Sequence, residues 1–303
     1  MSDPATPTLE SCVVCGGEQF DIPVHGDALF SCRSCGLVFR PGRDGAGLDH
    51  AFYEEQHFVS IEPDWIDGRR RVFAHEIRRL ASFRQTGRLL DVGAGHGFFL
   101  SACQDDGWQA TGIEISRQAA AYARDNFALE IIETPIETAP LPEDAFDVVT
   151  FWNVLDQVPD PRAAVLAAVR ALRPGGLLIV RSPNASFHLR IRQLARSLAG
   201  VMPPARKLNR LTVFHLYSFA PAVLQRLLTD AGMQSAEITA APLSWTKRAG
   251  DQTGFARKLL SQSIYGGAVA LQVMSGGRLQ YCPSIVARAI KPSRTLPAAL
   301  PEG

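Results

Sequence analysis

The sequence predicts an α/β fold, in which a mostly parallel sheet carries helices on both faces and follows a small cysteine-rich ribbon. Three observations support this fold class. Apolar runs of strand length alternate with segments of helix length after residue 87, a glycine-rich turn follows the first of these runs, and two cysteine pairs lie near the N-terminus. Such alternation is typical of parallel sheets, whose crossover helices cover both faces. With 303 residues, 46% of them hydrophobic, the chain can form one large domain and one small one.

Composition and charge narrow the class of protein. The apolar runs fall short of the roughly 18 residues that a membrane span needs, and MSDPATPTLE at the N-terminus has no export signal. We therefore expect a cytoplasmic protein. The net charge of +1 is unevenly divided, because residues 1–160 hold 12 Lys/Arg and 26 Asp/Glu, whereas residues 161–303 hold 19 and 4. The second half should attract an anionic partner, unless the two halves only balance as solvated surfaces.

The N-terminal ribbon carries a predicted metal site made of Cys12, Cys15, Cys32 and Cys35. The spacing C-x2-C-x16-C-x2-C suits two knuckles that give four thiolates to one tetrahedral Zn²⁺. Gly16 and Gly36 follow the pairs, where a knuckle turn favours positive φ. Two disulfides are the alternative, but reduced thiols are expected without an export signal. Because protein ligands fill all four positions, we predict a structural zinc.

The domain boundaries follow from changes in composition. We predict the ribbon and its linker over residues 1–45, the large domain over 46–292 and a disordered tail over 293–303. Two inserts interrupt the large domain, a basic one at 184–211 and a helical one at 246–280. Residues 49–83 are rich in aromatic and basic side chains and should be helical in part, with Ile77 and Leu80 buried.

Strands and helices then follow in order along the large domain. The predicted strands are 88–92, 108–116, 145–153, 175–183, 235–242 and 284–292. The predicted helices are 97–107, 117–127, 160–172 and 218–233. The last of these helices has Ser218 as its expected N-cap, Pro221 in its first turn and Gly232 as its stop. Residues 253–277 could form a helical pair that covers one edge of the sheet or a homodimer contact.

The glycine-rich turn is the strongest candidate for a binding site. Gly93, Gly95 and Gly97 follow the first strand, where missing side chains allow a ligand to approach the main chain and a helix start supplies N–H groups. Glu114 ends the next strand, 21 residues beyond Gly93, where a carboxylate can accept both hydroxyls of a ribose. These two facts fit a nicotinamide dinucleotide as well.

A series of motifs adds a resemblance to a known family. DVGAGHGFFL, followed by GIEIS, FDVVTFWNVLDQVPDP, RPGGLLIV and HLYSFAPAVLQRLLTDAGM, resembles the class I S-adenosylmethionine-dependent methyltransferases over about residues 50–290. More narrowly it is similar to the branch with a cysteine-rich N-terminal ribbon, which includes sugar and natural-product methyltransferases. The resemblance implies a Rossmann-like seven-stranded sheet with an antiparallel last strand, and S-adenosylmethionine as the cofactor.

The resemblance also implies roles for single residues. The aminocarboxypropyl end of the cofactor would lie along the glycine turn, Asp91 would order that turn, Glu114 would hold the ribose and Ile115 would pack on the adenine. The family's G-D-A-E before the third strand is TPIE here, with Pro135 in place of the acid. The contact to the adenine amino group would then come from the Ile136 main chain or Glu137, or be absent. The full predicted cofactor set is Asp91, Gly93, Ala94, Gly95, Gly97, Glu114, Ile115, Ile136, Glu137 and Asn153.

A general base is harder to place. Many relatives carry L-E-H-V after the third strand, but this chain has LDQV at 155–158, so Gln157 excludes a base at that position. The remaining candidates are His215, in the HLYSF segment, and His188, in the basic insert; for both, a solvated or structurally bonded imidazole is the alternative. His96 is interpreted as a loop surface residue or a lid over the cofactor. An acceptor hydroxyl would gain roughly two to four powers of ten in rate from a base, whereas an amine or activated carbon needs less.

The basic insert suggests the kind of acceptor. Arg190, Arg192 and Arg196 alternate with apolar residues in a predicted amphipathic helix that breaks at Pro203 and Pro204. We hypothesise that this helix receives a phosphate-bearing acceptor such as a nucleotide sugar, a lipid-linked glycan or a carrier-bound intermediate. Peripheral attachment to a membrane surface is the rival use of the same pattern.

The sequence therefore predicts methyl transfer from S-adenosylmethionine to a small or carrier-linked, anionic metabolite, at oxygen or carbon of a sugar-like or natural-product acceptor. No DNA partner is expected. An RNA methyltransferase is one alternative, since the basic second half would suit phosphates. Against it, the ribbon has only Arg33 and Arg40 as basic residues. A non-catalytic binding module is the other alternative, and the intact glycine turn with Glu114 weighs against that.

Overall fold

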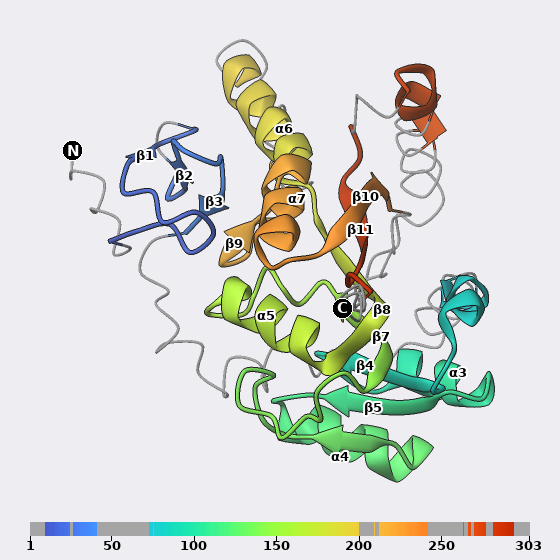
Figure 1. Cartoon of the computed structure of the whole chain (residues 1–303). Helices are drawn as coiled ribbons and strands as arrows, with labels where there is room; N and C mark the ends of the chain where they lie inside the picture. Colours follow the sequence, from blue (N-terminus) through green and yellow to red (C-terminus); the bar gives the residue numbers. More distant parts are fainter. Residues whose placement is uncertain are drawn as a thin grey trace, which may run out of the picture.

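The computed structural model has a seven-stranded mixed sheet at its centre (Figure 1). It describes residues 10–24, 27–40, 73–74, 76–199, 209, 212–241, 263, 266–267, 270–276 and 281–293. The strands lie in the order β10-β11-β8-β7-β4-β5-β6. The pairs β8-β7, β7-β4, β4-β5 and β5-β6 are parallel, whereas β11 is antiparallel to both of its neighbours. The predicted Rossmann-like sheet with an antiparallel last strand is confirmed.

The boundaries of the predicted strands and helices agree with the structure to within a few residues, and β6 is an additional strand that was not predicted. The strands of the large sheet are β4 Arg88–Val92, β5 Gln109–Ile113, β6 Glu130–Ile132, β7 Phe146–Trp152, β8 Leu172–Pro183, β10 Gln234–Ala240 and β11 Ser284–Ile290. The helices that connect or follow them are α3 Phe98–Asp105, α4 Arg117–Phe127, α5 Pro161–Ala171, α6 Ala185–Leu198 and α7 Pro221–Asp230, with a short 3-10 turn at Ala81–Phe83.

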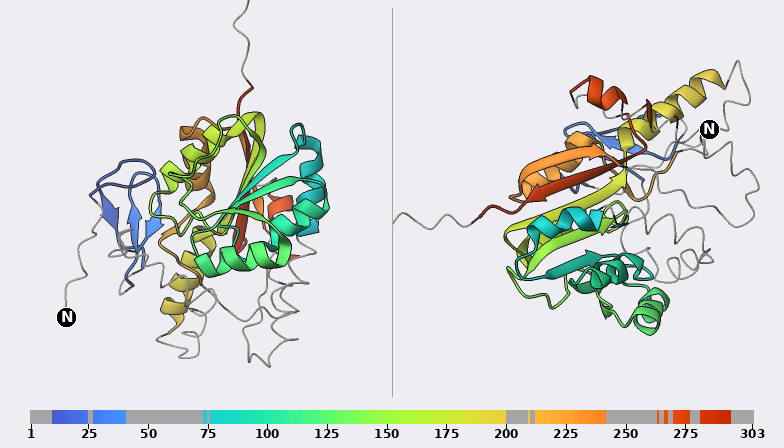
Figure 2. Two further views of the ribbon diagram at one scale, coloured as in Figure 1. Left: turned by 90° about the horizontal axis from the view of Figure 1, so that it is seen from below. Right: turned by 90° about the vertical axis from the view of Figure 1, so that its right-hand side faces the viewer.

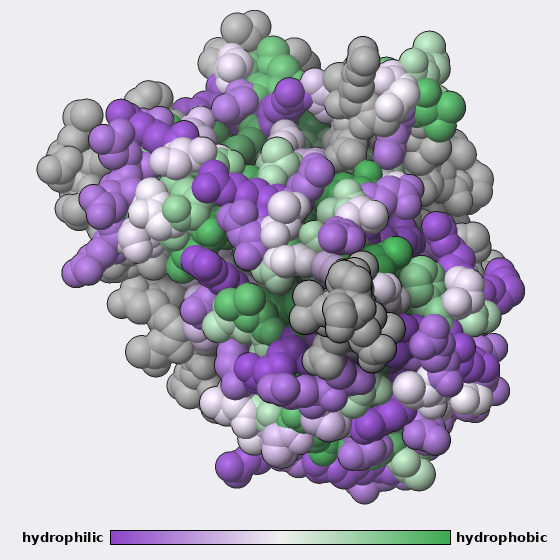
Figure 3. Space-filling model, in the orientation of Figure 1, coloured by the Kyte–Doolittle hydropathy of each residue, from purple (hydrophilic) through white to green (hydrophobic). Residues whose placement is uncertain are grey.

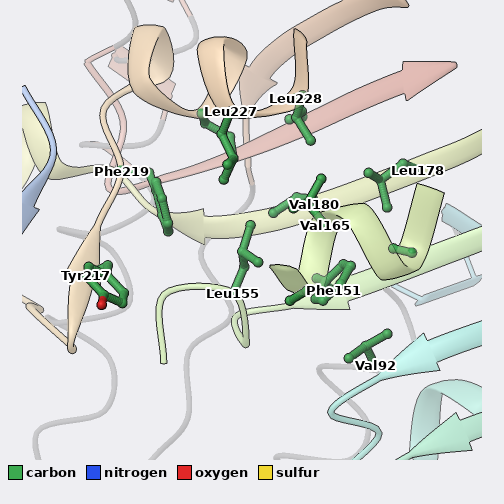
Figure 4. Close-up of a cluster of buried hydrophobic side chains, with 14 of the residues drawn as sticks. Val92, Phe151, Leu155, Val165, Leu178, Val180, Tyr217, Phe219, Leu227 and Leu228 are labelled. Carbon is green, nitrogen blue, oxygen red and sulfur yellow. The ribbon is translucent and has the colours of Figure 1, made fainter. Parts of the chain in front are cut away.

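Helices cover both faces of the sheet, and each face has its own hydrophobic core. Alternate residues of one strand point to opposite faces, so Leu89 packs in one core while Leu90 and Val92 pack in the other. The core that contains Leu90 is closed by α5 and α7. Figure 4 shows side chains of α5, α7, β7 and β8 meeting there. The opposite core is closed by α3, α4 and the helical residues 76–80, where Ile77 and Leu80 are buried as predicted.

The strand order places a ligand site at one edge of this sheet. Chain order reverses between β4 and β7, because β5 and β6 follow β4 on one side while β7 and β8 lie on the other. In open parallel sheets ligands bind outside the carboxyl ends of the strands at such a reversal. The residues that follow these ends are Gly93 after β4, Glu114 after β5 and Asn153 after β7.

The N-terminal ribbon is joined to the large domain by main-chain pairing. Its strands β1 Phe20–Asp21, β2 Phe30–Cys32 and β3 Val38–Phe39 form a four-stranded sheet with β9 Tyr217–Ser218, which lies far along the chain. Figure 1 shows the ribbon in blue beside β9, and both views of Figure 2 place it next to α6. Ribbon residues Phe30, Leu37 and Phe39 belong to the same hydrophobic core as α5 and α7.

The start of α7 differs from its prediction. We expected the helix to begin at Ser218 with that residue as N-cap, but Ser218 lies in β9 and pairs with Val38 of the ribbon. The N-cap is Ala220, which makes no side-chain cap hydrogen bond, and Pro221 opens the helix as expected. Ser218 therefore takes part in strand pairing. The local sequence around the helix could not predict this, because its partner Val38 is remote in the sequence.

Several predicted segments lie outside the described residues. They are the linker at 41–47, the stretch 49–72, Pro203 and Pro204, the tail from 294 and most of the insert at 253–277. In the described part of the chain, no helix combines the length and apolar character that crossing a membrane requires. Figure 3 shows hydrophilic residues over most of the described part of one face, including the ribbon.

Candidate functional site

The glycine turn after β4 is held open by its backbone. Gly93, Gly95 and Gly97 have φ values of 72°, 54° and 80°, which side-chain-bearing residues rarely adopt. A Cβ at Gly93 would lie 2.3 Å from Val154 Cγ2, and one at Gly97 would lie 2.4 Å from Leu129 Cδ1. A Cβ at Gly95 would meet no described atom within 4 Å. Gly93 and Gly97 thus serve packing, while Gly95 borders open space where a ligand can approach the main chain.

The turn is fixed to the end of β5. Gly93 and Ala94 both donate their N–H groups to the Ile113 carbonyl, at 2.7 and 2.9 Å. Asp91, only 2% exposed, accepts a hydrogen bond on Oδ1 from Thr150 Oγ1 at 2.6 Å, which ties β4 to β7 just before the turn. The strand ends that carry the site are therefore rigidly joined to one another.

Glu114 directs its carboxylate at the same turn. Oε2 accepts the Gly95 N–H at 2.7 Å and Oε1 accepts the Ser116 N–H at 2.8 Å. Burial raises the pKa of Glu114 above its ordinary value, although these two hydrogen bonds act in the opposite direction. A carboxylate oxygen has two lone pairs, so each oxygen keeps one acceptor position for a ligand hydroxyl. The arrangement can hold a vicinal diol next to bare main chain.

The predicted adenine contacts lie around the ends of β5 and β6. Ile115 is half-buried directly after Glu114. Ile136 is 2% exposed and belongs to the same hydrophobic core as Val92 and Ile113, at the ends of β4 and β5. Glu137 is half-buried, and burial raises its pKa. Of the predicted adenine contacts, the side chains of Ile115 and Glu137 are therefore partly accessible, whereas that of Ile136 is enclosed in the core.

Asn153, after β7, is held in an uncommon conformation. Its φ is 59°, in the left-handed region where asparagine is tolerated better than most residues. The Arg181 carbonyl accepts its N–H at 2.9 Å, and Arg181 Nη1 donates to its Oδ1 at 2.6 Å. Gln157 Nε2 donates to its carbonyl at 2.6 Å. The sequence predicted Asn153 but not Arg181, whose position in a buried strand was the only available signal.

His215 and Asp156 form a dyad. His215 Nδ1 is bonded to Asp156 Oδ2, and the Asp156 side chain is 1% exposed whereas that of His215 is 36% exposed. Asp156 Oδ1 has no hydrogen-bond partner among the residues that the structure describes. A buried carboxylate on Nδ1 leaves Nε2 as the nitrogen available to accept a proton. His215 was identified from the sequence as a candidate base, but Asp156 was missed. Asp156 is the neighbour of Gln157, the position at which a base was excluded.

The other two histidines considered in the sequence analysis, His188 and His96, have different surroundings. His188 is 3% exposed, its Nε2 lies 2.9 Å from the Pro283 carbonyl oxygen, and burial lowers its pKa to about 4. Its Nδ1 has no partner among the described residues. It is therefore a neutral, enclosed imidazole over most of the pH range. His96, in the glycine turn, is half-buried and packs edge-on against Tyr122, with ring centroids 5.1 Å apart.

The four ribbon cysteines converge on one point. Their sulfur atoms all lie within 4.8 Å of one another, with Cys12 and Cys35 at 3.6 Å and Cys15 and Cys32 at 3.5 Å. A tetrahedral zinc with Zn–S bonds of about 2.3 Å requires sulfur atoms roughly 3.8 Å apart. A disulfide would place two of them at about 2 Å, so the geometry fits a four-thiolate metal site. Gly16 and Gly36 have φ values of 70° and 81°, as the knuckle turns require.

The basic insert packs on the ribbon. Arg192 of α6 forms an ion pair with Asp27 at 2.5 Å and stacks over the Phe214 ring at 5.3 Å. Arg190 lies over the Tyr281 ring at 4.3 Å. Arg196 is exposed and borders a hollow of about 440 Å³ that Asp27 and Arg192 also line. Two of the three arginines predicted to bind an anionic acceptor thus make contacts within the protein.

Comparison with known proteins adds a family match. A family model described as a methyltransferase domain matches residues 65–235, more than half of the chain. The matched region includes the glycine turn, Glu114 and the Asp156–His215 dyad.

Relatives match over shorter stretches. The ubiquinone biosynthesis O-methyltransferase of Idiomarina loihiensis is 37% identical over 107 residues, which are 32% of this chain and 42% of that protein. The protein of the same name from Thiobacillus denitrificans is 29% identical over 159 residues, 50% of this chain and 66% of the relative. The match thus covers less than two thirds of each of these relatives.

A solved structure supports the fold. A chain from the complex between the Trm112 methyltransferase activator of Haloferax volcanii and a methyltransferase superposes with a TM-score of 0.50 at 16% identity, covering 82% of this chain and 95% of that chain. At that identity the likeness shows the fold alone.

Proposed function

The chain belongs to the methyltransferase-domain family, and from this premise we propose that it transfers the methyl group of S-adenosylmethionine to a hydroxyl oxygen of a small or carrier-linked metabolite. The observation that carries the proposal is the open main chain at Gly95 beside the Glu114 carboxylate. These two features match two parts of an adenosyl-amino acid. The amino-acid tail would lie along the glycine turn, and the ribose diol would bind the Glu114 carboxylate.

The residues present fit S-adenosylmethionine. Glu114 keeps an acceptor position on each oxygen for the ribose hydroxyls, and the half-buried Ile115 offers apolar surface for the adenine. Gly95 would lie under the amino-acid tail, and Asn153, held by Arg181, would face the tail from the next strand. The sulfonium of the bound cofactor supplies a methyl group that is already a reactive electrophile, so the protein has mainly to position the acceptor.

The Asp156–His215 dyad favours oxygen, rather than carbon or nitrogen, as the acceptor atom that is methylated. A hydroxyl must lose its proton as the new bond forms, and His215 Nε2 would accept that proton. Asp156 fixes the orientation of the imidazole through Nδ1. His215→Ala should lower kcat by roughly two to four powers of ten with little change in cofactor affinity. An unchanged kcat would remove His215 from the mechanism.

Zinc in the ribbon would have a structural role. All four cysteines point at one position, and none is replaced by a water or substrate ligand. The metal would hold together a short segment whose own apolar core is small.

The acceptor is proposed to be small and hydroxylated. The relatives in the comparison are named for O-methylation in ubiquinone biosynthesis, and a sugar-like or natural-product acceptor fits the same chemistry. We also propose that Arg196, at the hollow beside α6, contacts an anionic group of this acceptor. Arg196→Ala should then raise the acceptor KM without changing cofactor affinity. A KM equal to that of the unaltered protein would refute this part.

A transfer assay tests the function. The purified chain would be given methyl-labelled S-adenosylmethionine with catechol as a small diol, UDP-glucose as a nucleotide sugar, or bulk RNA. We expect label in a small-molecule acceptor and none in RNA. Label in RNA alone would favour an RNA methyltransferase, and cofactor binding without transfer to any of the three would favour a non-catalytic module.

A further inference from the structure

We propose that the cysteine ribbon positions the imidazole of His215, with Arg40 as the positioning residue at the contact. This inference rests on the proposed function, in which His215 accepts the acceptor's proton. The ribbon is then part of the machinery that orients the base.

The ribbon binds the chain on both sides of His215. β3 pairs with β9, so that Val38 faces Ser218 and Phe39 faces Tyr217. Arg40 continues this contact, because its N–H donates to the Leu216 carbonyl and its Nε donates to the Phe214 carbonyl, both at 3.1 Å. Described ribbon residues therefore bond or pair with Phe214, Leu216, Tyr217 and Ser218. The His215 side chain instead bonds Asp156.

The opposite side of the same segment is held by the loop after β7. The Asp156 carbonyl accepts the Tyr217 N–H at 2.9 Å, and the Tyr217 hydroxyl donates to the Pro159 carbonyl at 3.0 Å. The Asp156 carboxylate bonds His215 Nδ1. Figure 4 shows Tyr217 at one margin of the hydrophobic core that also contains Leu155. Residues 214–218 are thus clamped between the ribbon and this loop.

The carboxylate cannot follow a displaced histidine. Asp156 is 1% exposed and its neighbour Leu155 is fully buried, so the loop is fixed by the core. If the ribbon side of the clamp loosens, His215 moves away from Asp156 and loses its orientation. Misplacement of a reacting group by about 1 Å can lower a rate a hundredfold.

Contacts from α6 also hold the ribbon in place. Arg192 pairs with Asp27 and stacks on Phe214, and Gln193 Nε2 donates to the Pro23 carbonyl at 3.3 Å. The ribbon therefore touches Phe214 directly through Arg40 and indirectly through Arg192. A shift of the ribbon would therefore displace Phe214, the residue directly before His215.

The experiment compares two arginines of the same ribbon. Arg40→Ala removes the side-chain bond to Phe214, and Arg40→Lys keeps a donor there. Arg33→Ala is the matched control, because Arg33 pairs with Asp21 at 2.7 Å with side chains 56% and 54% exposed, away from β9. The metal-loaded full chains would carry ¹⁵N-labelled histidine, and the His215 signal would be assigned with His215→Ala. Binding of S-adenosylhomocysteine would confirm that each variant is folded.

We expect the Nδ1–H resonance of His215 to be sharp and slow to exchange in the unaltered protein and in Arg33→Ala, and broadened or shifted in Arg40→Ala. Arg40→Lys should restore most of it. Reversible removal of the metal with a chelator should have the same effect as Arg40→Ala, and zinc should reverse it. An unchanged His215 signal in Arg40→Ala, or after metal removal, would overturn the proposal.

Turnover separates this inference from the proposed function. On the acceptor that the transfer assay labels, Arg40→Ala should lower kcat by about 10 to 100-fold with KM altered less than twofold. A full loss of kcat in His215→Ala with none in Arg40→Ala would overturn the positioning role alone. An unchanged kcat in His215→Ala would instead contradict the proposal that His215 is the general base.

Discussion

At the scale of single residues, Gly95 differs from the glycines beside it. Steric contact with Val154 and Leu129 explains Gly93 and Gly97, but no described atom would touch a Cβ at Gly95. Its left-handed φ of 54° would cost an alanine roughly 1 to 2 kcal/mol. Besides this backbone cost, we propose that glycine is required by a ligand that lies against the peptide. The two contributions can be tested separately.

Gly95→Ala should therefore weaken S-adenosylhomocysteine binding by at least about tenfold, because the methyl group occupies ligand space. Gly232→Ala is the matched control, since Gly232 has a φ of 86° and no described atom within 4 Å of its would-be Cβ, but lies after α7. Both variants should lose about 1 to 2 kcal/mol of unfolding free energy. Calorimetry and denaturant unfolding give the two quantities. Equal affinity in both variants would contradict the assignment of the turn.

At the scale of elements, the two-residue strand β9 connects the ribbon to the large domain. The ribbon is a 31-residue stretch from Glu10 to Arg40, in which a few apolar residues surround the four cysteines. Chains below about 40 residues usually need a metal, a disulfide or a partner to fold. The sulfur positions are compatible with a metal, which we propose supplies this stability.

One zinc per chain should be found by metal analysis of the purified protein. Cys15→Ser should lose it and unfold at lower temperature, because three thiolates hold zinc less tightly than four. Cys103→Ala is the control, since Cys103 lies in α3, is fully buried and is outside the ribbon. It should keep the zinc. Intact disulfides in the ribbon by mass spectrometry would contradict the metal site.

The sequence predicts elements well where local periodicity determines them, and poorly where pairing is distant. α5 is a good case, because the helix predicted over residues 160–172 is found at Pro161–Ala171. β6 was missed because three residues, Glu130–Ile132, are too few to show a period. Ser218 was assigned to a helix cap because its partner Val38 is remote in the sequence.

The site divides in the same way. The glycine turn and Glu114 lie on consecutive strand ends, so their spacing alone predicts that they meet. Asp156 and His215 are 59 residues apart, and only the folded chain brings them together. Arg181 and Arg40 act through main-chain and amide contacts that carry no sequence motif. Zinc ligands are the opposite case, since their spacing is itself the signal.

At the scale of the whole molecule, the two ends of the sheet have different tasks. The carboxyl ends of the strands carry the candidate ligand site, while the amino end is closed by Asp147 of β7. This fully buried carboxylate accepts the N–H groups of Gln85, Thr86 and Gly87 on one oxygen and Arg173 Nε at 2.5 Å on the other. It satisfies the chain that enters β4 and has no contact with the site.

Asp147→Asn should lower the unfolding free energy by about 3 to 5 kcal/mol, because Arg173 loses its buried partner. Burial alone would raise the pKa of Asp147, but the hydrogen bonds from Arg173 and the three amides hold it below its ordinary value. This stabilisation is therefore present above the unfolded pKa of about 3.9 and is lost as pH falls through the lower folded value.

Denaturant unfolding at pH 7 and in acid measures that loss, and the variant should show the weaker dependence in acid. The Kd for S-adenosylhomocysteine should be unchanged at temperatures where the variant is folded. A large change in Kd would contradict the separation of the two ends.

The most direct measurement of the central claim is a double-mutant cycle between Glu114 and the ribose diol. Adenosine and 2′,3′-dideoxyadenosine would be titrated calorimetrically into the unaltered protein and Glu114→Gln. Hydrogen bonds to a charged group contribute about 1.5 to 3 kcal/mol each. We predict that the substitution weakens adenosine at least about tenfold more than the dideoxy compound. Equal weakening of both ligands would show that Glu114 does not hold the diol and would contradict the cofactor site.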